Sequence, residues 1–186
     1  LQHCRSCEQI FAQQLQHIHD GDSTEFWGEE LRGFAVGHAL SPAIIDESAS
    51  LDGAAQKLMW GKFINGGQTC IAPDYIFVPK NRVTEFVERS KKHLTKFYGN
   101  SSKHKQETKD FCRIVNKAHF DRLRDLVEET VKTGAKIAEG GVFKDDERYI
   151  SPTLLVDVAK NSPIMQDEIF GPILPVLTYE KLDEVY

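Results

Sequence analysis

From Ser41 onward, the chain alternates short apolar runs with longer segments whose apolar residues recur every three or four positions. The short runs predict buried strands, and the longer segments predict amphipathic helices. Because strands that alternate with helices are typical of parallel sheets, we predict an α/β fold with a mainly parallel sheet. The expected strands are residues 42–45, 75–78, 136–138, 150–156 and 173–177.

Helices are expected between these strands, and each ends at a glycine that can leave the helical conformation. Asn81 is the predicted N-cap of the middle helix, because its side chain can accept from free backbone N–H groups. We expect residues 100–110 to form a polar loop and a further helix to begin near Leu182. The apolar faces span residues 51–63, 83–97 and 120–131, and the glycines that follow are Gly66, Gly99 and Gly134.

Residues 1–40 read differently from the rest, so we divide the chain into an unassigned segment, 1–40, and a domain, 41–186. In the first part, Ile10, Phe11, Leu15 and Ile18 recur at helical spacing and predict a short amphipathic helix. The remainder of this segment shows no clear period, so we expect it to be helical or irregular.

Composition narrows the function classes. Apolar residues make up 40% of the 186 residues and charged residues 27%, as in an ordinary globular protein. The net charge of −5 and the lack of a dense basic cluster argue against nucleic-acid binding. The sequence contains no run of eighteen apolar residues, so no membrane span is predicted. Four cysteines and no visible secretory signal favour a reducing, cytoplasmic setting, and a first residue other than Met leads us to expect a fragment.

The first candidate for chemistry is Cys70, at the end of the sequence NGGQTC. A cysteine that follows a glycine pair lies where the backbone can turn sharply, so its thiol can be presented at a cleft. Nucleophilic catalysis needs this presentation together with surroundings that favour the thiolate. From spacing alone, a buried structural cysteine is the favoured alternative.

A second candidate is the sequence QDEIFGP at residues 166–172. The carboxylate of Glu168 has two acceptor oxygens for a sugar diol, and the ring of Phe170 offers a flat face to a heterocycle. The alternative is a solvated turn in which Phe170 fills the core.

A third candidate is the pair Cys4 and Cys7, with His17 and His19 downstream. Zinc sites of this kind need a second ligand pair at finger-like spacing, and two histidines two residues apart on a helix face different sides. We therefore predict no metal site.

Several stretches, in a fixed order, resemble the catalytic domain of aldehyde dehydrogenases, most closely the class 3 or fatty-aldehyde type. The combination of GQTC and EIFGP is highly specific for this family, although neither motif alone would identify it. Cys70 and Glu168 in these two motifs stand 98 residues apart. The matching stretches are SPAIID at 41–46, WGKFINGGQTCIAPDY at 60–75, FYG at 97–99, RIVN at 113–116, SPT at 151–153 and EIFGP at 168–172.

The resemblance implies a three-layer α/β catalytic domain that oxidises an aldehyde to a carboxylic acid with NAD or NADP, in a homodimer. Cys70 matches the family nucleophile, which forms a thiohemiacetal and then a thioester that water hydrolyses. Its backbone N–H would be one oxyanion donor. Glu168 matches the carboxylate that holds the nicotinamide ribose, and Phe170 matches the ring packed beside it. His119 lies where the family can place a side chain near the adenine-side ribose.

The chain also departs from the family pattern. Val36 stands where the family has the glutamate that activates water, and valine cannot take a proton. The glycine turn for the pyrophosphate, the amide that completes the oxyanion hole and the C-terminal dimerisation segment are not in this sequence. We therefore expect a truncated domain with weak or no activity. Two alternatives are a non-catalytic remnant that pairs with full-length subunits and a cysteine-dependent esterase that uses Cys70 without a dinucleotide.

Overall fold

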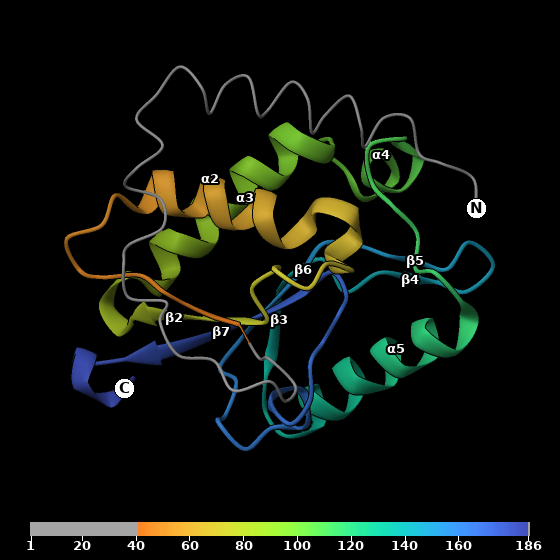
Figure 1. The fold of residues 1–186 in the computed structure, drawn as a ribbon. Coiled ribbons are helices and arrows are strands. Elements are labelled where there is room, and N and C mark those ends of the chain that lie inside the picture. The colour runs from red at the N-terminus through yellow and green to blue at the C-terminus, as the bar shows by residue number, and fades with distance from the viewer. Residues whose placement is uncertain (1–40, 186) are drawn as a thin grey trace. The chain divides into compact units, whose positions relative to one another are not determined.

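A five-stranded sheet forms the centre of the domain (Figure 1). The computed structural model describes residues 41–185. The strand order is β1-β2-β7-β6-β3, and only β3 runs antiparallel to its neighbour. This confirms the prediction of an α/β fold with a mainly parallel sheet. The strands are β1 (Pro42–Ile44), β2 (Tyr75–Pro79), β3 (Lys136–Glu139), β6 (Thr153–Val156) and β7 (Ile173–Tyr179).

Helices cover the sheet on both faces, which gives three layers. Helices α2 (Leu51–Phe63) and α3 (Val83–Tyr98) lie on one side, and α5 (Lys117–Lys132) lies on the other (Figure 1). Side chains alternate along each strand, so β7 sends Leu174 and Val176 into the core under α2 and α3 and Ile173 into the core under α5. The apolar periodicity that predicts these helices therefore marks the faces that they bury.

Local departures from the predicted elements have simple causes. Helix α3 is preceded by a 3₁₀ turn, Lys80–Arg82, so its N-cap is Arg82 and the prediction of Asn81 is wrong. Residues 100–110 are not all loop, because the Ser101 side chain accepts from the His104 N–H and starts α4 (Ser102–Glu107). The helix expected near Leu182 is a 3₁₀ turn, Leu182–Glu184.

The segment 150–156 is two strands rather than one. Its first residue belongs to a small hairpin of β4 (Phe143–Lys144) and β5 (Tyr149–Ile150), and Pro152 separates this hairpin from β6. Proline has no N–H to donate, so the apolar run cannot continue as one strand through it.

Three expectations concern residues 1–40, namely the short helix, the absence of zinc at Cys4 and Cys7 and the place of Val36, and all three lie outside the described residues. Among residues 41–185, no helix is long and apolar enough to span a bilayer.

Candidate active site

The loop that carries Cys70 starts where α2 ends. After Phe63 the chain makes a 3₁₀ turn, Ile64–Gly67, in which Asn65 adopts a left-handed conformation with φ of 51°. The Asn65 side-chain amide donates to the Gln68 carbonyl oxygen at 3.0 Å and closes the turn. Cys70 follows this turn and is exposed. The alternative of a buried structural cysteine is therefore wrong, and the thiol has the accessibility that a nucleophile needs.

The Cys70 loop lies directly against the second candidate segment. A Cβ built on Gly67 would lie 2.5 Å from the Gly171 carbonyl carbon and 3.0 Å from the Pro172 nitrogen. Gly67 also has φ of 72°, in the left-handed region that side chains rarely adopt. Only glycine fits here, so the two motifs recognised in the sequence meet backbone to backbone.

Residues 168–170 divide their side chains between the core and the surface. Ile169 is 1% exposed and fills the core under α5, whereas Glu168 and Phe170 are half-buried. Phe170 adopts φ of 52°, an uncommon conformation for an aromatic residue. The alternative in which Phe170 fills the core is not what the fold shows, because Ile169 takes that place.

Side chains of helix α5 bind backbone carbonyl oxygens of this segment. The Phe170 carbonyl oxygen accepts from His119 Nε2 at 2.7 Å, and the ring centroids of His119 and Phe170 lie 6.2 Å apart. The Arg122 guanidinium donates to the Ile169 carbonyl oxygen, and Arg122 Nε donates to His119 Nδ1 at 3.4 Å. Both ring nitrogens of His119 thus have protein partners. A contact between His119 and a cofactor ribose stays a prediction.

Two buried charged residues that the sequence reasoning missed lie behind the site. Asp74 is 3% exposed, and its carboxylate accepts from the backbone N–H groups of Ile169 and Ser41, each at 3.1 Å. Lys62, on α2, is fully buried. Burial lowers the pKa of Lys62 to about 8, while the charges of Asp74 and Glu168 act in the opposite direction.

These two residues carried a weak signal in the sequence. Lys62 stands among the apolar positions of α2, eight residues before Cys70, and Asp74 stands between proline and an apolar strand. A charged residue at a core position is uncommon without a partner, and this is the observation that could have found them.

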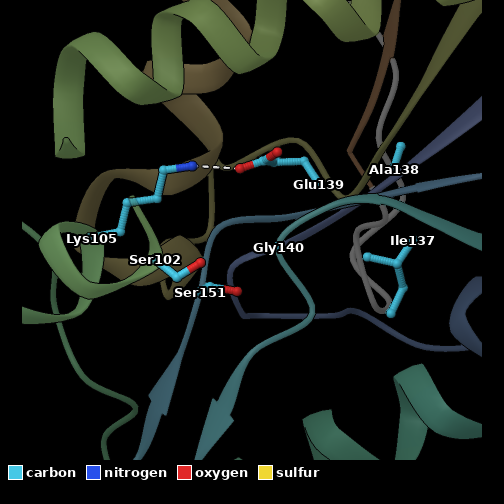
Figure 2. A pocket seen from close by; sticks show the side chains of 7 residues that line it. All are labelled: Ser102, Lys105, Ile137, Ala138, Glu139, Gly140 and Ser151. Atoms are coloured by element: carbon cyan, nitrogen blue, oxygen red, sulfur yellow. Dashed lines mark hydrogen bonds and ion pairs between the residues drawn. The ribbon is translucent and has the colours of Figure 1, made fainter. Parts of the chain in front are cut away.

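A cavity of about 300 Å³ lies elsewhere, between α4 and the edge strand β3 (Figure 2). Lys105 of α4 and Glu139 of β3 form an ion pair at it. Cys70, Glu168, Phe170 and His119 do not line this cavity, so it is separate from the candidate active site.

Comparison with known proteins identifies the family of this chain. The model of the aldehyde dehydrogenase family matches residues 37–186. The rat aldehyde dehydrogenase described as dimeric and NADP-preferring is 43% identical over 144 residues, which is 77% of this chain and 30% of the relative. The 4,4'-diaponeurosporen-aldehyde dehydrogenase of Staphylococcus aureus is 46% identical over the same shares.

Solved structures point to the same family. The substrate-bound aldehyde dehydrogenase AldH of Staphylococcus aureus superposes with a TM-score of 0.73 at 46% identity, over 78% of this chain and 30% of that one. The chain thus spans about 30% of the length of the relatives it matches. The family match covers most of the chain and includes the loops of Cys70 and Glu168. This chain belongs to the aldehyde dehydrogenase family.

Proposed function

We propose that this chain supplies the catalytic cysteine and part of the nicotinamide site for the oxidation of an aldehyde to a carboxylic acid. The observation that carries the proposal is the contact between the Cys70 loop and the segment of Glu168 and Phe170, made at Gly67. This contact supports a site that combines the exposed thiol of Cys70 with the carboxylate and the ring of the half-buried Glu168 and Phe170.

In this proposal the thiolate of Cys70 attacks the aldehyde carbonyl carbon and forms a thiohemiacetal. The backbone N–H of Cys70 stabilises the oxyanion. Loss of hydride leaves a thioester on Cys70, which water hydrolyses to the carboxylic acid. The resemblance puts Val36 at the position of the family's general base, so we propose that this last step is slow in this chain.

The residues present fit one end of a nicotinamide dinucleotide. The Glu168 carboxylate has acceptor oxygens for ribose hydroxyls, and the ring of Phe170, which is only half-buried, could pack against a heterocycle. Bound NAD or NADP would supply the hydride acceptor. The rat relative is named as NADP-preferring and dimeric, and we extend both properties to this chain as proposals.

Competition for the thiol tests this function. Cys70 and Cys112 are alkylated with iodoacetamide, with and without an aliphatic aldehyde, and each cysteine is followed by peptide mass spectrometry. We expect Cys70 to react faster than the half-buried Cys112, and the aldehyde to slow Cys70 alone. The matching alcohol is the control. Equal protection by the alcohol, or a Cys70 that does not react, would argue against the proposal.

A further inference from the structure

The side chain of Gln68 links the Cys70 loop to a segment far away in the sequence. Its Nε2 donates to the Arg113 carbonyl oxygen at 3.1 Å, and its Oε1 accepts from the Val115 N–H at 2.9 Å. Nε2 also donates to the Asn65 carbonyl oxygen at 3.0 Å. The amide therefore uses both of its donors and one of its acceptor positions within the protein.

These contacts reproduce the pairing of a parallel strand. In such a pair, one residue donates to the carbonyl before its partner and accepts from the N–H after it. The Gln68 amide does this with Ile114 as the partner, because it binds the groups of Arg113 and Val115 on either side. A side chain thus takes the place of a strand at the edge of residues 113–115.

The segment that Gln68 binds, residues 113–115, makes further contacts of its own. Ile114 is buried and exchanges hydrogen bonds with Arg148, donating its N–H to the Arg148 carbonyl oxygen and accepting from Arg148 Nε, each at 3.0 Å. Arg113 is paired with Glu147 at 2.9 Å and lies over the ring of Tyr149. Gln68 therefore ties the Cys70 loop to a rigid anchor.

The same anchor leads directly into the helix that holds the other half of the site. Asn116 caps α5, whose His119 and Arg122 bind the backbone of Ile169 and Phe170. The Cys70 loop is thus fixed at two points, by Gly67 against Gly171 and by Gln68 against residues 113–115.

We propose that Gln68 is a positioning residue that fixes the Cys70 thiol relative to its oxyanion donor and to Glu168. This rests on the proposed function, in which Cys70 attacks a carbonyl carbon. Replacement by glutamate presents an acceptor to two carbonyl oxygens and removes both donors. Replacement by asparagine keeps the amide but shortens its reach by one methylene.

The first test is structural and needs no activity. Val115 is 68% exposed and its N–H is bonded to Gln68 Oε1, so hydrogen exchange at that amide reports on the contact. In the 186-residue chain, Gln68→Asn should speed exchange at Val115 by about 10-fold while Ile114 stays protected, because the shorter side chain cannot hold this bond. The controls are Gln56→Asn and Gln56→Glu, the same changes at an exposed position of α2.

The second test separates positioning from simple accessibility. Acylation of Cys70 by p-nitrophenyl acetate needs the oxyanion donor, whereas alkylation by iodoacetamide does not. We expect the ratio of the two rates to fall about 10-fold in both Gln68 variants and to stay unchanged in Gln56→Glu. In Gln68→Glu the ratio should recover as the pH falls toward the usual range of a carboxyl group, because a protonated glutamate can donate again.

The outcomes distinguish the two proposals. Unchanged exchange at Val115, or an unchanged ratio of rates in both variants, would overturn the role of Gln68 and leave the function of Cys70 standing. If the unaltered chain is not acylated at Cys70 at all, the proposed function fails, and positioning for carbonyl attack fails with it. Hydrogen exchange then still reports whether the Gln68 contact exists.

Discussion

Gly67 packs against the peptide bond between Gly171 and Pro172, with no room for a side chain between them. This contact brings the loop of Cys70 to the segment of Glu168 and Phe170, although almost a hundred residues separate the two motifs in the sequence. Because the contact is between backbones, it fixes the relative position of the loops more tightly than a pair of flexible side chains would.

Gly67→Ala should therefore disrupt the site. The new methyl group would collide with backbone atoms and force a positive φ on alanine, so we expect a loss of about 3 kcal/mol in the free energy of unfolding. Urea denaturation measures this loss. The control is Gly61→Ala in α2, where a Cβ meets nothing within 4 Å. There we expect a gain of about 0.5–1 kcal/mol, and equal effects at the two positions would contradict the packing described.

Asp74→Asn should loosen the support of Ile169. The asparagine oxygen can replace only one of the two carboxylate oxygens that accept from the N–H groups of Ile169 and Ser41. We expect a loss of about 1–3 kcal/mol in the free energy of unfolding by urea denaturation. Asp125→Asn, on the exposed face of α5, should cost less than about 1 kcal/mol. A loss at Asp74 no larger than at Asp125 would show that these bonds are unimportant.

Lys62 should make stability depend on pH in the alkaline range. Its pKa is about 8 in the folded chain and 10.5 in the unfolded chain. Between these values the unfolded chain binds a proton that the folded chain has lost, so the free energy of unfolding rises with pH. This gain in the free energy of unfolding is absent below pH 8, is complete above pH 10.5 and amounts to about 3 kcal/mol.

Lys62→Met isolates this effect. Denaturation curves from pH 7 to 10 should show that the variant lacks the rise seen in the unaltered chain. Lys96→Met, at an exposed position of α3, is the control and should keep the rise. A parallel pH dependence of the unaltered chain and Lys62→Met would mean that Lys62 does not titrate in this range.

Much of the fold follows from the apolar pattern, because strands and helices bury the faces that the sequence marks. The turn at Lys80–Arg82 and the break at Pro152 escaped this reasoning, since they depend on one or two residues rather than on a period. Helix α4 escaped it as well, because its six residues are polar and its stability comes from the cap at Ser101 and the ion pair of Lys105 with Glu139.

The residues of the candidate site also fall into two groups, those that the sequence indicates and those that only the structure reveals. Cys70, Glu168 and Phe170 stand in motifs whose order and spacing resemble those of the family, so the sequence offers them as candidates. Gln68, Asp74 and Arg122 act through hydrogen bonds to backbone groups 45 or more residues away, and no local pattern encodes such partners. His119 was predicted, but its bond to the Phe170 carbonyl oxygen becomes visible only when α5 is placed beneath that segment.

Glu168→Gln should weaken cofactor binding. An amide offers one acceptor oxygen where the carboxylate offers two charged ones, so we expect the affinity for NAD or NADP to fall about 10-fold in a calorimetric titration. Asp167→Asn is the matched control, because Asp167 is the exposed neighbour in the same segment. Equal affinities of the two variants would contradict the assignment of Glu168.

The most direct test of Cys70 as the nucleophile measures the reduced cofactor formed from an aliphatic aldehyde and NAD or NADP. The unaltered chain, Cys70→Ser and Cys112→Ser are compared in a single-turnover experiment, because slow thioester hydrolysis would limit later turnovers. We expect reduced cofactor from the unaltered chain and from Cys112→Ser, and none from Cys70→Ser. Reduced cofactor from Cys70→Ser in the same amount as from the unaltered chain would contradict the role of Cys70 as the nucleophile.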